Sequence, residues 1–450
     1  MVGQMIISNK LVDKMNLPLR PYVLLRVGVR IVKTKLGISY NPAESYNLSP
    51  QLAQALLLKW GPKLQIRYDH AADVLHIGPT IGILTSALPH KGEFTANSTQ
   101  AELIYLSNIG RTLNAQVYIF TPQSIDWESQ STRGYVYKPS SDNFGIWESS
   151  IYPLPDVVYD RIPSRKAEAR ASIKMTKRRL MNLPDLKYFN TSFFNKWRVY
   201  ELLASNYLLL PYLPETRILN NANLQAMLGR HRVLYVKPAN GSLGRGIIKT
   251  YSKGDGKIHY ATYRNGIQYG SADHAAQFLD KTKSFRQKGT YIVQQGIDLA
   301  RYKESAFDIR IIYQKNGEGK WTISKKFIRV AARGSSISNL SKGGRAEQSK
   351  TVLNQVLNGN KRLIEAKNIE MKNLCETVAV TMEKTSQSIL GELGLDIGID
   401  QQGRLWLIEV NSKPRKTTET EMSQTIVRNT FKRPLEFGVY LAGFSNTKKS

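Results

Sequence analysis

The sequence predicts an α+β fold in which a β-rich amino-terminal domain precedes two mixed lobes. Short alternating apolar runs separated by turn residues dominate the first 150 residues. After residue 190, helical and strand patterns alternate along the chain. The 450 residues are enough for about two to four domains of roughly 100–200 residues each. We expect a β-rich domain at 1–150, a basic connecting segment at 151–185, a central lobe at 186–300 and a carboxy-terminal lobe at 301–450.

The composition is that of a folded protein with a strong basic excess. The 64 Lys and Arg residues against 35 Asp and Glu residues give a formal net charge of +29. Such a charge attracts nucleic acid, anionic polymers, phosphorylated substrates and acidic membranes, and it does not distinguish among them. No apolar run is long enough for a signal peptide or a membrane span, so we expect the cytoplasm of the producing cell.

The cysteine and histidine content argues against a disulfide framework and a zinc site. Cys375 is the single cysteine, and it falls in a helical pattern, which favours an inert, partly buried thiol over a nucleophile. The six histidines are scattered and lack the spacing of zinc ligands.

The first 185 residues contain a β-rich part and then a basic part. The run "YVLLRVGVRIV" alternates like a half-buried strand, "PQLAQALLLKW" reads as a helix, and the prolines of "SIYPLPDVVYDRIP" indicate a boundary. Residues 161–180 hold eight basic residues and one acid. This segment is either a solvated helix face or a polyanion contact. It lacks interleaved aromatic residues, which makes nucleic acid the less favoured partner.

A glycine-rich loop is the first candidate site. In "VLYVKPANGSLGRGIIKT" Lys237 ends an apolar strand, and the glycine spacing fits neither a P-loop, a dinucleotide fingerprint nor a kinase loop. Both flanks read as strands, so we expect a hairpin flap. Its glycines would let backbone N–H groups approach phosphate oxygens while Lys237 adds a positive charge. A plain hairpin with a loose loop is the alternative.

A pair of carboxylates is the second candidate site. In "LDIGIDQQGRLWLIEVN" two strands flank a turn at 401–404. If Asp400 lies opposite Leu405, then Asp396 lies opposite Glu409, with their Cβ atoms about 5 Å apart. Asn411 projects from the same face as Glu409. Two carboxylates and an amide suit Mg²⁺ with substrate phosphates. The alternative is a solvated acidic pair, and we expect a local structural role for Asp400.

The remaining pattern supplies strands and a helix around these sites. "TYIVQQGI", "DIRIIYQ" and "WTISKKFIRVAA" read as strands, and residues 334–350 read as a loop. Five apolar residues at helical spacing predict one helix face, namely Leu374, Val378, Met382, Ile389 and Leu393.

Taken together, these motifs resemble the ATP-grasp superfamily over about residues 185–430, and its carboxylate–amine ligases most. "NKWRVYELL", "NGSLGRG", "YIVQQGI", "FDIRII", "NLSKGG" and "LIEVNSKP" follow one another in the order of that family's motifs. "IGPTIGILT", "PDVVYDRIPSRKAEAR" and "YIVQQGIDLA" extend the likeness to the YheC/YheD family of endospore coat-associated proteins over most of the chain.

The resemblance implies two α+β lobes that clamp ATP, with Mg²⁺, and it assigns roles to residues. The implied catalytic residues are Arg310, Arg329 and Asn339. The implied nucleotide-binding residues are Lys196, Lys237, Gly241, Ser242, Gly244, Gly246, Gln294, Gln295, Ile297 and Asp298. The implied metal ligands are Asp396, Glu409 and Asn411. The sequence departs from the family at the hinge, where glutamines replace the usual glutamate and Asp298 is the candidate for the ribose contact.

Two hypotheses follow from this resemblance. The first is an ATP- and Mg²⁺-dependent ligase that joins a carboxylate to an amine through an acylphosphate. The second is a spore-coat structural or interaction protein that keeps the fold, with or without ATP binding, but without turnover. The expected partners are ATP, spore-coat proteins, and an unidentified carboxylate and amine. An anionic polymer or a peptide is a candidate for these two substrates. No membrane insertion is expected, and family resemblance places the protein at the spore coat.

Overall fold

A computed structural model describes residues 1–59, 63–86, 98–139, 145–241, 244–263, 266–331, 344–417 and 423–444. The chain forms two compact units. Unit 1 comprises Met1–Ser192, Gln314–Thr322 and Arg415–Ser450, and unit 2 comprises Phe193–Tyr313 and Ile323–Pro414. The four domain ranges expected from the sequence stay a prediction. None of the helices in the described ranges is both long and apolar enough to cross a membrane.

The first sheet of unit 1 has six strands in the order β4-β1-β3-β2-β6-β5. Their bounds are β1 Gln4–Ser8, β2 Tyr22–Val27, β3 Arg30–Ser39, β4 Tyr46–Leu48, β5 Gln65–Asp69 and β6 Val74–Gly78. The alternating run expected as a strand is in fact two, β2 and β3, because Gly28 turns the chain with φ 56°. Helices α1 (Asn9–Met15) and α2 (Pro50–Ala55) begin at serine caps.

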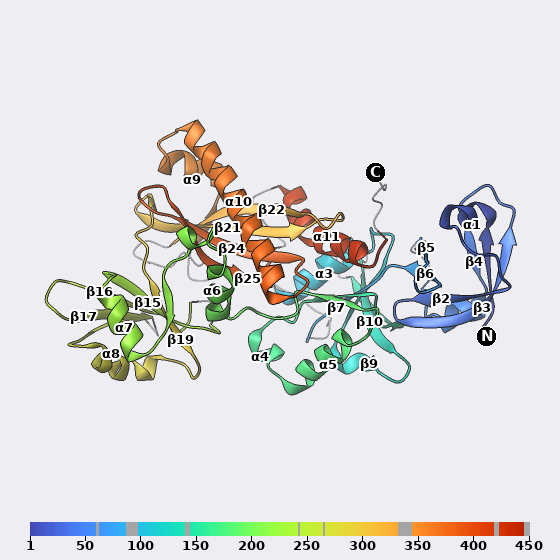
Figure 1. The fold of residues 1–450 in the computed structure, drawn as a ribbon, viewed down its shortest axis with the longest axis horizontal. Coiled ribbons are helices and arrows are strands. Elements are labelled where there is room, and N and C mark those ends of the chain that lie inside the picture. Colours follow the sequence, from blue (N-terminus) through green and yellow to red (C-terminus); the bar gives the residue numbers. More distant parts are fainter. Residues whose placement is uncertain are drawn as a thin grey trace. The chain divides into compact units, whose positions relative to one another are not determined.

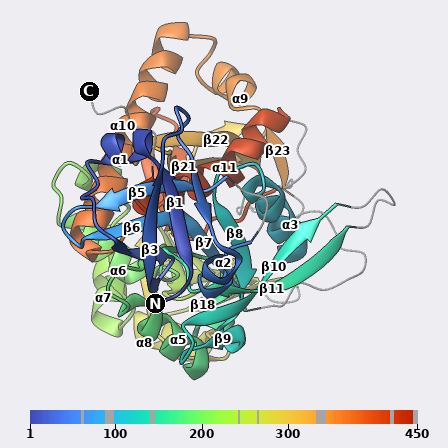
Figure 2. The ribbon, with the colours of Figure 1, turned by 90° about the vertical axis from the view of Figure 1, so that its right-hand side faces the viewer.

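The second sheet of unit 1 contains the parallel strands β8, β7, β12 and β13, extended by an antiparallel hairpin, β10 and β11. Figure 2 shows this hairpin reaching outward. The bounds are β7 Thr80–Leu84, β8 Gln116–Phe120, β9 Ile125–Asp126, β10 Ser131–Lys138, β11 Ile146–Pro153, β12 Val157–Asp160 and β13 Lys187–Phe189. Helices α3 (Thr99–Gly110) and α11 (Gln424–Leu441) pack together, and α11 also contacts β12. The turn η1 is Pro122–Ser124.

The basic connecting segment folds into α4 (Arg165–Glu168) and α5 (Ala171–Met181), and its charges divide into two groups. Lys177 is 6% exposed, and its Nζ lies 2.8 Å from Asp160 and 2.7 Å from Glu168. Arg161 is also buried and pairs with Glu102. The polyanion hypothesis is therefore wrong for Lys177 and Arg161, which belong to the core, and it remains a prediction for the exposed cations of α5.

The first sheet of unit 2 is antiparallel, with the order β14-β19-β15-β16-β17-β18. Its strands are β14 Thr216–Ile218, β15 Val233–Pro238, β16 Ile248–Ser252, β17 Ile258–Tyr263, β18 Ile267–Ala272 and β19 Tyr291–Gln295. Helices α7 (Asn221–Leu228) and α8 (Ala275–Lys281) lie against it (Figure 1), and η3 (Lys283–Phe285) follows α8. Leu234, Val236 and Phe278 belong to the core between these helices and the sheet.

The second sheet of unit 2 has the order β23-β22-β21-β24-β25. Its strands are β20 Arg301–Tyr302, β21 Ser305–Lys315, β22 Trp321–Val330, β23 Arg345–Glu347, β24 Glu392–Ile399 and β25 Leu405–Asn411. The helices of this part are α6 Lys196–Ala204, η2 Leu210–Tyr212, α9 Ser349–Val356 and α10 Lys361–Ser386.

The long helix α10 confirms only part of the predicted apolar face. Leu374, Val378 and Met382 are buried on α10, but the placement of Ile389 and Leu393 on the same helix is wrong. The helix ends because Gln387 adopts the left-handed conformation, with φ 50°. Strand β24 begins at Glu392.

Replacing Lys177 with Ala should lower the free energy of unfolding by about 3–5 kcal/mol, because Asp160 and Glu168 would both lose a buried ion-pair partner. The exposed Lys174 on the same helix is the matched control, and Lys174→Ala should change it by less than about 0.5 kcal/mol. Urea denaturation measures both. Equal small effects would contradict the assignment of Lys177 to the core.

Candidate functional site

A pocket within unit 2 brings together residues from both of its sheets and from α6. Its empty space, including open solvent at its mouth, is about 800 Å³. The lining residues are Lys196, Val199, Tyr200, Leu203, Leu213, Pro214, Lys237, Pro238, Gly241, Gly244, Arg245, Ile247, Ile292, Gln294, Leu407, Ile408, Glu409 and Val410. Six of the residues predicted from the sequence are therefore together, namely Lys196, Lys237, Gly241, Gly244, Gln294 and Glu409.

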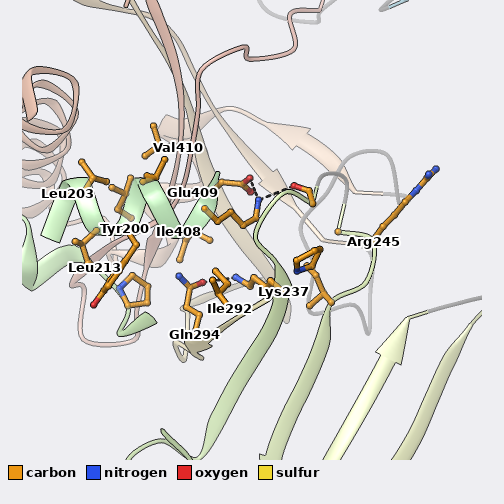
Figure 3. A pocket seen from close by; sticks show the side chains of 18 residues that line it. Tyr200, Leu203, Leu213, Lys237, Arg245, Ile292, Gln294, Ile408, Glu409 and Val410 are labelled. Atoms are coloured by element: carbon orange, nitrogen blue, oxygen red, sulfur yellow. Dashed lines mark hydrogen bonds and ion pairs between the residues drawn. The ribbon is translucent and has the colours of Figure 1, made fainter. Parts of the chain in front are cut away.

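The pocket has an apolar part and a charged part. Tyr200, Leu203 and Leu213 gather on one side with Ile408, whereas Glu409 and Lys237 lie toward the glycine loop (Figure 3). The side chain of Arg245 extends away from the other labelled residues. A flat apolar group with an anionic tail matches this division, because apolar walls bind the first and cations bind the second.

The glycine-rich loop joins β15 to β16, which pair antiparallel, so the predicted hairpin is confirmed. Gly244 and Gly246 have φ values of 67° and 72°, in the left-handed region where a side chain would be strained. A Cβ at Gly246 would also lie 2.8 Å from the hydroxyl of Tyr291. Both glycines are therefore required by the path of the loop. Ser242 lies outside the described residues.

Lys196 joins the first turn of α6 to β25. Asn195 caps this helix by accepting a hydrogen bond from the backbone N–H of Arg198. The Lys196 Nζ lies 2.6 Å from Glu409 Oε1 and 3.2 Å from the carbonyl oxygen of Gly241. Burial acts to raise the pKa of Glu409, but Lys196, Arg310 and Lys237 outweigh it and hold that pKa below its usual value. Glu409 is therefore an anion among cations.

Lys237 projects from β15 into the same charged region. Its Nζ donates a hydrogen bond of 2.7 Å to Gln294 Oε1, and Gln294 Nε2 donates one of 3.0 Å to Thr216 Oγ1. Burial lowers the pKa of Lys237 to about 8, with a further lowering from Lys196 and an opposing effect from Glu409. An anionic ligand beside Lys237 would relieve this cost by supplying a full negative charge.

The β24–β25 hairpin places Asp396 opposite Glu409, as the sequence predicted, but by a different register. The turn is one residue longer than predicted, because Ile399, not Asp400, lies opposite Leu405. A β-bulge at Ile408 then shifts the pairing by one residue between Ile397 and Asp396. The predicted pairing of Asp400 with Leu405 is therefore wrong. The bulge restores the facing carboxylates.

Asp400 has the structural role expected of a turn residue. Its Oδ1 accepts hydrogen bonds from the backbone N–H groups of Gln402 and Arg404, at 3.0 and 2.8 Å. Its Oδ2 accepts one of 2.8 Å from the indole of Trp406. These bonds hold the turn closed and leave Asp400 committed to the hairpin itself.

Asp396 lies in a row of alternating charges on β21, β22 and β24. Its two carboxylate oxygens are 2.9 Å from Arg310 Nε and 2.9 Å from the Arg329 guanidinium. Arg329 also binds both oxygens of Asp308, at 2.7 and 2.8 Å. Burial acts to lower the pKa of Arg329, but Asp396 and Asp308 raise it overall. Thus Asp308 pairs with Arg329, and Arg310 pairs with Asp396.

The donor set at this hairpin fits Mg²⁺ in its chemistry. Glu409 lines the pocket, Asp396 faces it across the hairpin, and Asn411 is two residues along β25. Both oxygens of Asp396 already contact arginines, so a cation there would share that carboxylate. Within the described ranges, no three or more His, Cys, Asp and Glu side chains form a group suited to a metal ion.

The remaining predicted residues lie beyond the pocket lining or outside the described chain. Gln295 ends β19, and its Oε1 accepts a 3.1 Å hydrogen bond from the backbone of Glu215. Asp298 is exposed, and its Oδ2 accepts one of 3.0 Å from Gln401. Ile297 precedes it in the link to β20. Asn339 lies outside the described residues. The roles assigned to these residues stay predictions.

Sequence reasoning missed the apolar walls of the pocket. Tyr200 and Leu203 come from α6, Leu213 and Pro214 from the turn after it, and Ile408 from the bulge. The periodicity of α6 could have indicated an inward apolar face. The exposure of Ile408 toward the pocket depends on the bulge, for which the sequence has no simple signal. Cys375 is buried, as expected of an inert thiol, and burial raises its pKa to about 12.

Comparison with known proteins identifies the family. A model described as YheC/D like ATP-grasp matches residues 185–441, more than half of the chain, and the protein belongs to that family. Membership confirms the predicted family and the ATP-grasp fold of this region.

Individual relatives are similar over most of the chain. The endospore coat-associated protein YheD of Bacillus subtilis (strain 168) is 29% identical over 424 residues, 92% of this chain and 90% of that protein. YheC of the same organism is 24% identical over 365 residues, 80% and 96% of the two chains. The crystal structure of D-alanyl-alanine synthetase A from Vibrio cholerae O1 biovar eltor aligns with a TM-score of 0.45 and 15% identity, over 82% of this chain and 98% of that one.

The ionisation of Lys237 is directly measurable. After ¹³C reductive methylation, which keeps the charge of lysines, one dimethyl-lysine resonance should titrate near pH 8, and it should be missing from Lys237→Arg. Gln294→Glu should move this midpoint upward, because a carboxylate would then accept the bond from Lys237. A spectrum in which every lysine titrates near its ordinary pKa of about 10.4 would contradict the burial of this charge.

Proposed function

We propose that this protein is an ATP- and Mg²⁺-dependent carboxylate–amine ligase of the endospore coat, acting through an acylphosphate. The observation that carries the proposal is one pocket with an apolar part, two lysines beside a glycine loop, and a carboxylate opposite a second carboxylate. In this assignment the base of ATP lies against Tyr200 and Leu213, and its phosphates lie near Lys196 and Lys237. YheD and YheC, named as endospore coat-associated, support the location.

The chemistry assigned to the site has two steps. A carboxylate oxygen of one substrate attacks the γ-phosphorus of ATP, giving an acylphosphate and releasing ADP. The nitrogen of the amine then attacks the acyl carbon, forming an amide and releasing phosphate and a proton. Arg310 and Arg329 are assigned to the charge of the transferred phosphoryl group. Asn339 is assigned to the same pocket from its motif alone.

Glu409, Asp396 and Asn411 would hold the metal. When bound, Mg²⁺ would neutralise the negative charge that builds up on the phosphate oxygens. Because Lys196 contacts Glu409 at 2.6 Å, we propose that Lys196 exchanges Glu409 for a phosphate oxygen when nucleotide binds. This exchange keeps each charge compensated in both states.

One observation favours a second function, a coat protein that keeps the fold without turnover. The hinge carries Gln294 and Gln295 where the family's usual glutamate is expected, and Gln294 is bonded to Lys237 and Thr216. Both oxygens of Asp396 likewise lie 2.9 Å from arginine nitrogens, although Oδ1 accepts no hydrogen bond. A protein of this kind would bind ATP without consuming it, or would not bind it.

ATP with Mg²⁺ should raise the melting temperature of the protein. A ligand at about 100 times its Kd adds ~2.7 kcal/mol of stability to the native state. Differential scanning fluorimetry with and without ATP·Mg²⁺ measures the shift, and Lys237→Met should remove most of it. A wild type that melts at the same temperature in millimolar ATP·Mg²⁺ would overturn nucleotide binding.

Glu409→Gln separates the two functions. Glutamine keeps an acceptor for Lys196, so the free energy of unfolding should change by only about 1 kcal/mol. ADP release in the presence of Mg²⁺ and pooled carboxylates and amines should fall by about 100-fold or more, as expected when a preorganised charge is lost. If Glu409→Gln released ADP as fast as the wild type, the metal assignment would be wrong. If the wild type released no ADP, the non-catalytic coat protein would be favoured.

A further inference from the structure

The face of the β15–β19 sheet that carries Lys237 continues beyond the pocket. Helices α7 and α8 cover the opposite face, where Leu234 and Val236 are buried. Side chains alternate along a strand, so Val233, Tyr235 and Lys237 project from the face without these helices. Lys237 lines the pocket, and Tyr235 is the next residue on this face.

Cross-strand register extends this face across the sheet in a row. Tyr235 lies opposite Gln294 on β19 and opposite Lys249 on β16. Lys249 lies opposite Ala261 on β17, and Ala261 lies opposite Tyr269 on the edge strand β18. Four steps between neighbouring strands span about 19 Å. The row therefore begins at the pocket, with Gln294, and ends at an exposed tyrosine.

A second row runs beside the first. Tyr251 on β16 lies opposite His259 on β17, and their rings stack at 5.7 Å between centroids. Lys253 Nζ lies 5.9 Å from the centre of the Tyr251 ring. We call six of these residues the sheet platform, namely Tyr235, Lys249, Tyr251, Lys253, His259 and Tyr269. Ala261, between Lys249 and Tyr269 in the first row, is buried.

The sheet platform carries cations and hydroxyl groups, and its outer end is open to solvent. Tyr269 is 72% exposed, and Lys253 is also exposed. The carboxylate of Asp255 is bonded to His259 at 2.7 Å, which leaves the lysines as the main charges of the platform. Tyrosine hydroxyls and lysine ammonium groups both donate hydrogen bonds to carboxylates.

We propose that the sheet platform binds an acidic polypeptide, one end of which is the carboxylate or amine substrate at the pocket. This proposal rests on the ligase function proposed above and specifies its substrate class. An extended chain rises about 3.3 Å per residue, so the first row would hold about six residues. A polymer with carboxylate side chains supplies both the anions that the lysines bind and the group that the proposed reaction activates.

Nucleic acid matches the sheet platform less well. It lacks the carboxylate that the proposed reaction consumes. Its binding also depends on many phosphate contacts, about 6–10 in strong cases, whereas the platform offers two lysines and one histidine already bonded to Asp255. Single-stranded nucleic acid that stacks on tyrosines is therefore the competing outcome of the test.

The test measures binding of fluorescein-labelled poly-L-glutamate by fluorescence anisotropy, with a labelled oligothymidylate of the same length as the comparison. The variants are Lys249→Glu and Tyr269→Ala. Lys283→Glu is the matched control, because this substitution makes the same change of charge at an exposed lysine outside the platform. Lys283 lies in η3, which follows α8. Melting temperatures check that each variant is folded, and the exposed Tyr269 makes its replacement safe for folding.

Lys249→Glu should weaken poly-L-glutamate binding about 10-fold, a change of ~1.4 kcal/mol, and Tyr269→Ala should weaken it several-fold. Lys283→Glu should change it less than about 2-fold, the part due to net charge alone. The proposal would be overturned if Lys249→Glu and Lys283→Glu weakened binding equally, or if the wild type did not bind poly-L-glutamate. It would also be overturned if oligothymidylate bound more tightly than poly-L-glutamate and its binding fell equally in the two platform variants.

The melting shift of wild type with ATP·Mg²⁺ distinguishes failure of this proposal from failure of the proposed function. If the platform binds poly-L-glutamate but ATP·Mg²⁺ does not raise the melting temperature, the ligase function is overturned and the platform is retained. If ATP·Mg²⁺ raises the melting temperature but Lys249→Glu and Tyr269→Ala do not selectively weaken poly-L-glutamate binding, nucleotide binding is retained and the platform is overturned.

Discussion

The ion pair between Lys196 and Glu409 is the contact on which the candidate site depends. It joins residues 213 positions apart, one on α6 and the other on β25, at 2.6 Å. Glu409 stays anionic because Lys196, Arg310 and Lys237 compensate the cost of its burial. The apolar side chains of α6 line the pocket on the same helix as Lys196. One ion pair therefore sets both the charged part and, through α6, an apolar wall.

Charge compensation explains the rest of the site as well. Asp308, Arg329, Asp396 and Arg310 alternate in sign, so that each buried charge has an opposite neighbour. Lys237 is the exception, since its nearest side-chain partner is the neutral Gln294, and burial lowers its pKa to about 8. A site with an incompletely compensated cation is suited to an anionic ligand, because the ligand removes a cost that the free protein bears.

Local sequence pattern identified several residues that line the pocket, but not the contacts that they make there. A lysine before a glycine hairpin follows from local alternation, which a single segment specifies, whereas the facing of Asp396 and Glu409 was predicted from a register that differs from the observed one. The bulge at Ile408 and the Lys196–Glu409 pair depend on packing between distant segments, which local pattern does not contain. The same limit explains Lys177, whose charge suggested a solvent-facing residue although Asp160 and Glu168 hold it in the core. Ile389 and Leu393 were wrongly assigned to the helix because the left-handed Gln387 ends it first.

The most direct test of the account is the position of a bound nucleotide. A crystal structure of the protein with Mg²⁺ and a non-hydrolysable ATP analogue should show the base against Tyr200 and Leu213. The phosphates should contact Lys196 and Lys237, with the metal at Glu409. A nucleotide bound elsewhere would contradict the account. So would an analogue in the pocket whose phosphates contact neither lysine while the Lys196–Glu409 pair persists.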